Sequence, residues 1–268
     1  MSDSLTLTEA ACRVITTPAP ADKVALTRRF AGEWAEGTIA EVGTTPPPDR
    51  PARPARPELL MPRDMPKRRK GGAAGRLAFL HAIAHIELNA IDLAWDIVAR
   101  FVAEDMPRAF YDDWVQVALD EAAHFDMLEQ RMGHLGGSYG DLPAHDGLWQ
   151  AAEETADDLM ARLALVPMVL EARGLDTTPA AVAKLRANGD SESADILEHI
   201  GAEEIPHVAA GTRWFRHLAD RRDVAAEAAF HELVRTRFKG QVKAPFNHAA
   251  RTEAGMDAAF YEPLAAAG

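Results

Sequence analysis

Four segments of this chain have the apolar periodicity of a core-facing helix, and each carries a carboxylate inside its apolar stripe. Apolar residues recur at i, i+3, i+4 and i+7, as on a helix with one buried face. Each stripe has one glutamate where such a helix would place a leucine, and two stripes add a histidine three residues later. These residues are Glu87, Glu121 with His124, Glu171, and Glu204 with His207.

A carboxylate on a buried helix face needs a cation nearby, because burying an unpaired charge is costly or shifts its pKa. Lys and Arg are scarce on these stripes, so basic side chains do not supply the countercharge. Carboxylates and imidazoles are ligands that iron and manganese bind in proteins. Glu and His at i and i+3 project from the same side of a helix, so one turn supplies two ligands. We therefore predict that metal ions neutralise these glutamates.

The spacing of the glutamates supports a shared site. Glu87 and Glu121 are 34 residues apart, and the helix break near Met106 falls about midway between them. In an antiparallel hairpin with equal rise on both arms, the two carboxylates lie at the same height. Glu171 and Glu204 are 33 residues apart around a second turn. Each helix pair is thus expected to bring its two glutamates together.

The residue pattern predicts an all-α protein, because Ala-rich segments with Leu, Glu and Arg favour helix. Helices are expected over 73–104, 107–132, 147–173, 191–219 and 223–238, with two short ones in 5–36. A further short helix is expected to open at Thr178, after a stop at Gly174. We predict an antiparallel four-helix bundle with extra N- and C-terminal helices. Its divisions are an N-terminal helical extension (1–43), a Pro-rich arm or linker (44–70), the bundle (71–220), and a C-terminal helix and tail (221–268).

The order of these residues resembles a known pattern. One Glu, then Glu-x-x-His, then one Glu, then Glu-x-x-His on successive helices is the di-iron carboxylate arrangement of ferritin-like proteins. The two motifs here are Glu121-Ala-Ala-His124 and Glu204-Ile-Pro-His207. With their flanking residues they look like a bacterial family of unknown function placed in that superfamily. The resemblance covers about residues 71–220 and extends distantly to the di-iron hydroxylase that modifies tRNA.

The resemblance implies two metal ions, with iron expected first and manganese as the alternative. One glutamate of each half would serve a single metal ion, namely Glu87 and Glu171. The motif glutamates, Glu121 and Glu204, would bridge the ions, and each ion would bind one histidine, His124 or His207. An acidic residue precedes each motif and would accept a hydrogen bond from a ligand histidine on the facing helix. These second-sphere candidates are Asp120 and Glu203.

The function implied is a di-iron oxidoreductase that activates O₂ to hydroxylate or oxidise an unidentified small molecule or modified nucleoside. No catalytic residue is expected beyond the metal ligands. A separate electron donor is expected, because the chain has no nucleotide-binding glycine motif. Two alternatives stay open: iron storage, detoxification or peroxide reduction as in other ferritin-like proteins, and a metal-free helical interaction module.

Composition restricts partners and location. The net charge of −12 argues against nucleic acid as a partner, and the resemblance leaves tRNA as the one exception. The dense basic run Lys67–Lys70 is interpreted as the solvated end of the linker. Cys12 is the single cysteine, so no intrachain disulfide can form. The sequence shows no secretory signal and no apolar run of the ~18 residues that a membrane span needs. We expect a cytoplasmic protein, with a homodimer compatible with the sequence.

Other polar residues near the motifs receive ordinary interpretations. His85 lies on the opposite side of its predicted helix from Glu87. His81 and His85 are therefore interpreted as core or surface histidines. Asp92 and Asp96 are assigned to the helix surface, and nothing in the sequence selects a tyrosine, Tyr139 included, as a redox partner.

Overall fold

The computed structural model describes residues 5–66 and 72–265, and this part of the chain is helical with no strand. The all-α prediction is confirmed. The chain divides into two compact units, Met1–Gln150 and Ala151–Gly268, which are described separately. The predicted bundle, 71–220, has parts in both units, and the basic run Lys67–Lys70 lies outside the described residues.

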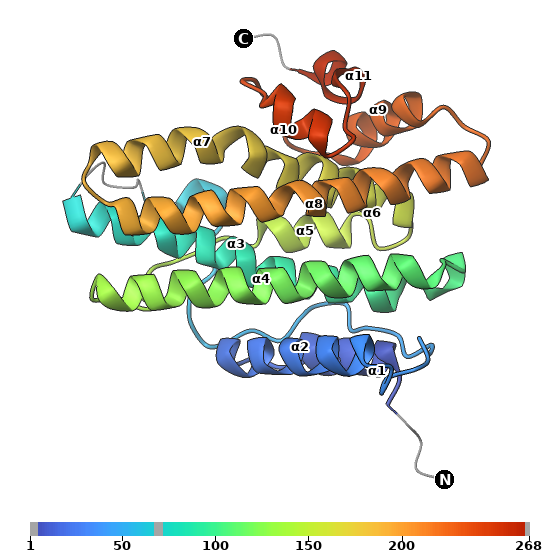
Figure 1. Ribbon diagram of the computed structural model, residues 1–268, viewed down its shortest axis with the longest axis horizontal. Coiled ribbons are helices and arrows are strands. Elements are labelled where there is room, and N and C mark those ends of the chain that lie inside the picture. Colours follow the sequence, from blue (N-terminus) through green and yellow to red (C-terminus); the bar gives the residue numbers. More distant parts are fainter. Residues whose placement is uncertain (1–4, 67–71, 266–268) are drawn as a thin grey trace. The chain divides into compact units, whose positions relative to one another are not determined.

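The first unit is built around a long helical hairpin. α3 and α4 form the hairpin, α1 packs on α3, and α2 packs on α4 (Figure 1). α5 begins at the end of this unit and crosses its boundary. The bounds are α1 (Leu7–Ile15), α2 (Pro20–Ala35), α3 (Gly72–Arg100), α4 (Arg108–His134) and α5 (Gly147–Glu153).

The turn between α3 and α4 lies where the sequence predicts the helix break. A 3₁₀ turn covers Val102–Glu104, and Asp105 adopts a left-handed conformation with a φ of 50°. Aspartate tolerates that conformation better than most residues. Pro107 then stands directly before the first residue of α4, where its missing N–H costs nothing. The tight turn lets the two helices pack along their length.

The Pro-rich arm lies along the first unit and is fastened to it at several points. Ala52 N–H donates to the Ile15 carbonyl oxygen at 2.9 Å. Further along, Leu60 N–H donates to the Ala144 carbonyl oxygen at 2.8 Å, and Ala144 N–H donates to Glu58 at 3.0 Å. The arm therefore connects the N-terminal helices to the segment after α4 by ordered backbone contacts.

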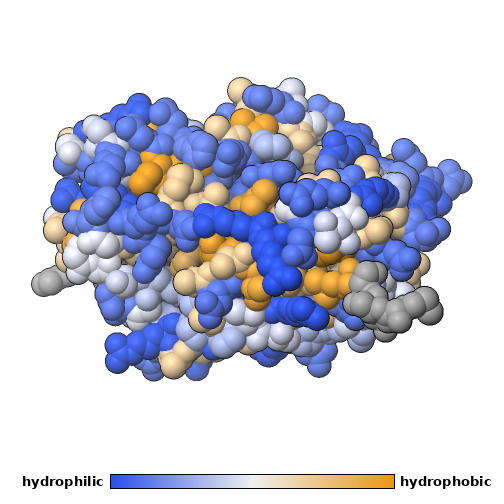
Figure 2. Space-filling view, turned by 60° about the horizontal axis from the view of Figure 1, so that its bottom comes forward, coloured by the Kyte–Doolittle hydropathy of each residue, from blue (hydrophilic) through white to orange (hydrophobic). Residues whose placement is uncertain are grey.

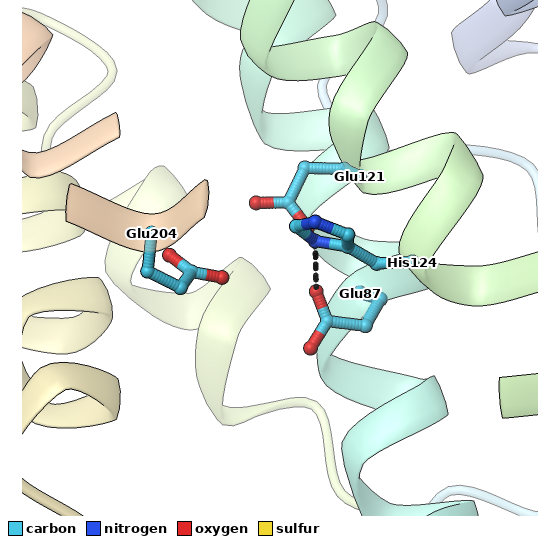
Figure 3. Close-up of side chains that lie close together, drawn as sticks. All are labelled: Glu87, Glu121, His124 and Glu204. Atoms are coloured by element: carbon cyan, nitrogen blue, oxygen red, sulfur yellow. Dashed lines mark ion pairs between the residues drawn. The ribbon is translucent and has the colours of Figure 1, made fainter. Parts of the chain in front are cut away.

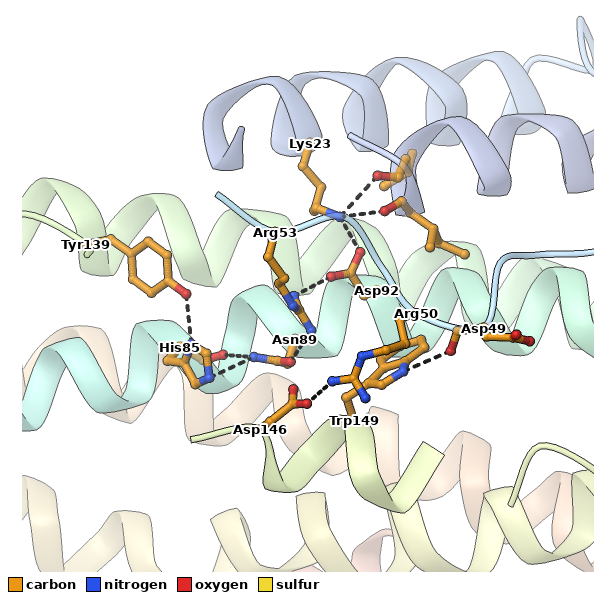
Figure 4. Close-up of polar contacts among 12 residues, drawn as sticks. Lys23, Asp49, Arg50, Arg53, His85, Asn89, Asp92, Tyr139, Asp146 and Trp149 are labelled. Atoms are coloured by element: carbon orange, nitrogen blue, oxygen red, sulfur yellow. Dashed lines mark hydrogen bonds and ion pairs between the residues drawn. The ribbon is translucent and has the colours of Figure 1, made fainter. Parts of the chain in front are cut away.

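A buried charged network joins the arm to α3 (Figure 4). Asp92, which the sequence assigns to the surface, is completely buried and forms ion pairs with Lys23 of α2 and Arg53 of the arm. Lys23 also donates to the Val14 carbonyl oxygen at 3.1 Å. Asp96 is buried too, and Arg100 Nε donates to it at 2.9 Å. The surface assignment of both aspartates is wrong, because distant segments cover this face of α3.

The second unit contains a second helical hairpin, formed by α7 and α8, with shorter helices around it. α8 also packs on α6 and on a π-helical segment that leads into α7. The bounds are α6 (Leu159–Leu165), the π-helical segment (Val166–Glu171), α7 (Ala172–Ala187), α8 (Ser191–Arg221), α9 (Ala226–Arg237), α10 (His248–Glu253) and α11 (Ala258–Tyr261).

The third predicted helix differs most from the structure. Residues 147–173 are interrupted once, between Glu153 and Leu159, and the helical stretch that begins at Leu159 runs on through Gly174 and Pro179 to Ala187. Leu175, Val182 and Leu185 of α7 are buried. Packing of this face offsets the low helix propensity of glycine and proline, so the predicted stop is wrong.

Gly211 allows α8 to approach the π-helical segment closely. A Cβ atom at Gly211 would lie 2.5 Å from both Cβ and Cγ of Pro167, a distance that real side chains do not adopt. The absence of a side chain at Gly211 therefore fixes how closely α8 passes the segment that ends in Glu171.

On the face drawn in Figure 2, most of the surface is hydrophilic, and hydrophobic residues are exposed among the hydrophilic ones, mainly across the middle. Among the described residues, α3 alone is long and apolar enough to cross a membrane. Of its most apolar stretch, 67% is buried inside the protein, as in the core helix of a soluble fold.

Candidate metal-binding residues

Three of the predicted ligands meet inside the first unit. α3 supplies Glu87, and α4 supplies Glu121 and His124, whose side chains point toward one another (Figure 3). His124 Nδ1 lies 3.4 Å from Oε2 of Glu87 and 3.4 Å from Oε2 of Glu121. Each residue offers a ligand atom, and these atoms lie within 4.8 Å of one another. The group is the kind of cluster that could hold a metal ion.

The hairpin register explains why these residues meet. Glu87 precedes the last residue of α3 by 13 positions, and Glu121 follows the first residue of α4 by 13 positions. Equal numbers of residues on the two arms place the carboxylates at the same height. The i, i+3 spacing then puts His124 on the same face as Glu121. The structure agrees with the 34-residue spacing seen in the sequence.

The group is buried, and its two carboxylates need a positive charge close by. Glu87 is 3% exposed, Glu121 is 1% exposed and His124 is 0% exposed. Burial by itself would lower the pKa of His124, but the adjacent carboxylates of Glu121 and Glu87 raise that pKa to about 11. A proton on His124 thus supplies the positive charge that the two carboxylates require. A metal ion bound to the same atoms would supply more of it.

The donor set fits a hard or borderline metal ion. Two carboxylates and one imidazole suit iron, manganese or zinc, and the absence of sulfur ligands disfavours soft metals. Nδ1 of His124 faces the carboxylates, so it is the nitrogen that would bind the ion, with the proton held on Nε2. The hairpin thus brings the two carboxylates and the imidazole together.

The second unit holds the other predicted ligands on two elements. α8 carries Glu204 and His207, with His207 Nδ1 3.6 Å from Oε2 of Glu204. Glu204 is 8% exposed and His207 is 1% exposed. Glu171 is the last residue of the π-helical segment, on which α8 packs. Single π-helical turns are frequent at functional sites, because the extra residue redirects the side chains that follow. α8 continues through Pro206, inside the second motif, to Arg221.

The two second-sphere candidates make contacts on their own helices. Gln116 Nε2 donates to Oδ1 of Asp120 at 2.7 Å. Glu203 lies 3.4 Å from Nε2 of His199 and is 36% exposed at its side chain. The predicted bonds from ligand histidines on facing helices stay predictions.

Sequence reasoning missed a polar cluster next to the first group. Tyr139, from the loop after α4, has its hydroxyl 2.8 Å from Nδ1 of His85, and its ring stacks on His81. The same ring meets the edge of Phe125, the residue after His124. Burial lowers the pKa of His85 to about 4. No sequence pattern predicts the position of Tyr139, because a loop brings it next to His85, which lies 54 residues earlier in the sequence.

Comparison with known proteins gives a family and a relative. The family described as "Protein of unknown function (DUF455)" matches residues 16–262. A protein of Haemophilus influenzae, described as uncharacterized, is 42% identical over 208 residues, which cover 76% of this chain and 72% of the relative. No solved structure matches the chain. The chain therefore belongs to the DUF455 family of proteins of unknown function.

Proposed function

We propose that this protein is a di-metal oxidoreductase whose metal ligands are the six residues that the sequence predicts. The observation that carries the proposal is the group of Glu87, Glu121 and His124, in which both carboxylates lie 3.4 Å from one imidazole nitrogen. The other three ligands are Glu171, Glu204 and His207. They repeat the same residue types, with Glu and His again at i and i+3 on one helix.

Charge supports two ions rather than one. Four glutamates carry four negative charges, and two divalent cations neutralise them completely. A single divalent ion would leave a buried excess of two negative charges. The resemblance implies a ferritin-like four-helix bundle around the two ions. It gives Glu121 and Glu204 the bridging positions.

A centre of this kind supplies redox chemistry toward O₂, coupled to hydroxylation or oxidation of a substrate, with iron as the preferred metal and manganese as the alternative. The chain's own residues fix the ligand geometry and keep the ions away from bulk water. The small exposed fractions of Glu87, Glu121 and His124 support that role. Substrate, O₂ and an electron donor would come from outside the chain.

Metal analysis after anaerobic reconstitution with Fe(II) tests the proposal. We expect about two iron ions per chain, followed by O₂ consumption when air is admitted. Less than about one ion per chain, with either Fe(II) or Mn(II), would overturn the di-metal centre. Two ions without O₂ consumption in the presence of a chemical reductant would overturn the oxidoreductase.

Two single variants separate the halves of the centre. Glu121→Ala and Glu204→Ala should each lower the metal content, because each removes a proposed bridging ligand. Glu198→Gln on α8 is the matched control, since Glu198 is 60% exposed and pairs with Arg186 on the surface. Loss of metal with Glu121→Ala but not with Glu204→Ala would confine the site to the first unit.

A further inference from the structure

The second unit contains a cavity beside the segment that ends in Glu171. Its volume is about 80 Å³. The π-helical segment contributes Met168, Val169 and Leu170 to its lining, and the chain after α9 contributes a further group of residues. The cavity therefore touches the residue directly before a proposed metal ligand.

The interior of the cavity is apolar. Phe230 and Met256 of the lining are buried, and Phe238, Val242 and Phe246 add further apolar side chains to it. A cavity of about 150 Å³ with such a lining holds a benzene molecule. At about 80 Å³ this one is suited to a short hydrocarbon chain rather than to a ring system.

One buried charge in the lining is already neutralised. Arg251 donates to both carboxylate oxygens of Asp176, at 2.9 and 2.7 Å. Both side chains are almost fully buried. Asp176 and Arg251 thus form a buried ion pair whose two charges offset each other.

Two other cations, Arg173 and Lys243, lie in the lining. Arg173 uses only Nη1 in its bonds to described residues, donating to the carbonyl oxygens of Lys243 and Pro245 at 2.7 and 3.2 Å and approaching Asp176 at 3.4 Å. The ammonium group of Lys243 forms no ion pair with a described residue. Both side chains are solvent-accessible, so they lie at the outer part of the lining. This local positive excess belongs to a chain whose net charge is −12.

We propose that this cavity binds a small carboxylate with a short alkyl chain. The alkyl chain occupies the apolar interior, and the carboxylate contacts Arg173 and Lys243. A guanidinium group matches a carboxylate through two nitrogens, which favours this head group over an alcohol or amine. Binding at this cavity stands independently of the metal centre. Only its use as the substrate pocket rests on the proposed function.

The test uses hexanoate, 1-hexanol and hexylammonium as probes on the full-length protein kept metal-free with a chelator. Isothermal titration should give a millimolar Kd for hexanoate and binding about three- to tenfold weaker for hexanol. Hexylammonium should not bind. Equal binding of hexanol or hexylammonium, or no saturation by hexanoate at tens of millimolar, would overturn the proposal.

Three variants locate the site. Lys243→Gln should weaken hexanoate binding about two- to fivefold. Lys239→Gln, four residues earlier and outside the lining, should leave it unchanged. Val242→Phe should abolish hexanoate binding, because the larger ring fills the cavity. The melting temperature of this variant shows whether it folds. If it does not fold, the result for Lys243→Gln alone tests the proposal. Equal effects of the two lysine variants would overturn the proposal. If the protein binds hexanoate but takes up no metal, the proposed binding cavity stands and the proposed metal centre is wrong.

Discussion

Nδ1 of His124 lies 3.4 Å from Oε2 of Glu87, although the two side chains come from different helices and are 37 residues apart in sequence. Glu121 approaches the same nitrogen at 3.4 Å. Two carboxylates around one buried imidazole form an arrangement that requires a cation. In metal-free protein that cation is a proton, and the pKa of His124 is about 11.

Metal-free protein should lose stability as pH rises above neutral. The pKa of His124 is raised in the folded state, against about 6.5 for an unfolded histidine. The associated stabilisation is complete below pH 6.5 and is lost progressively toward pH 11. Melting temperatures between pH 6.5 and 10 should therefore fall more steeply for wild type than for His124→Gln.

Metal-loaded protein should show a weaker pH dependence in the same range, because a bound ion replaces the proton. His134→Gln on the same helix is the control and should keep the wild-type slope, since His134 lies on the surface. Identical slopes for wild type and His124→Gln in metal-free protein would contradict the proposed role of the proton.

Asp92→Asn should destabilise the first unit strongly. The carboxylate of Asp92 is fully buried between Lys23 and Arg53, and its removal leaves cationic groups without their countercharge. Breaking a buried ion pair in this way costs about 3–5 kcal/mol in the free energy of unfolding. Urea unfolding measures it. Asp195→Asn should cost less than about 1 kcal/mol, because the Asp195–Arg186 pair is largely exposed. Similar losses for both variants would refute this account of the network.

The sequence predicts features that depend on local periodicity. The ends of α3, α4 and α8 and the turn near Met106 follow from apolar spacing and turn residues, and so does the meeting of Glu87 with Glu121. Features that depend on distant segments are not predictable in this way. Lys23 reaches Asp92 across 69 residues, so nothing near Asp92 in the sequence signals its burial.

The π-helical segment illustrates a second limit. Its one extra residue per turn leaves no clear mark in the apolar pattern, so the sequence does not show where the segment lies. The contact between Pro167 and Gly211 is visible only in the structure, where α8 packs against the segment. The predicted position of Glu171 therefore depends on a packing contact that periodicity does not contain.

His85 should make the protein sensitive to mild acid. Burial lowers its pKa to about 4 from an ordinary value of 6.5. The folded state therefore resists protonation, and stability falls as pH drops from 6.5 to about 4, by roughly 3 kcal/mol at the limit. Urea unfolding of His85→Gln at pH 7 and pH 4.5 should show a smaller difference than wild type. His199→Gln, at an exposed position, should behave like wild type; a smaller difference there as well would point to a general acid effect.

Gly211→Ala should destabilise the second unit and disturb the position of Glu171. Its Cβ would lie 2.5 Å from Cβ and Cγ of Pro167, so α8 and the π-helical segment must separate. Overpacking of this kind costs about 1–3 kcal/mol. Gly174→Ala in α7 is the matched control: a Cβ there meets nothing within 4 Å, and alanine should stabilise the helix by about 0.5–1 kcal/mol. Urea unfolding should therefore show a loss of stability for Gly211→Ala and a gain for Gly174→Ala.

Metal content should fall only in Gly211→Ala, because only that change moves the segment carrying Glu171. An unchanged metal content with a clear loss of stability would separate the packing of α8 from the ligand role of Glu171.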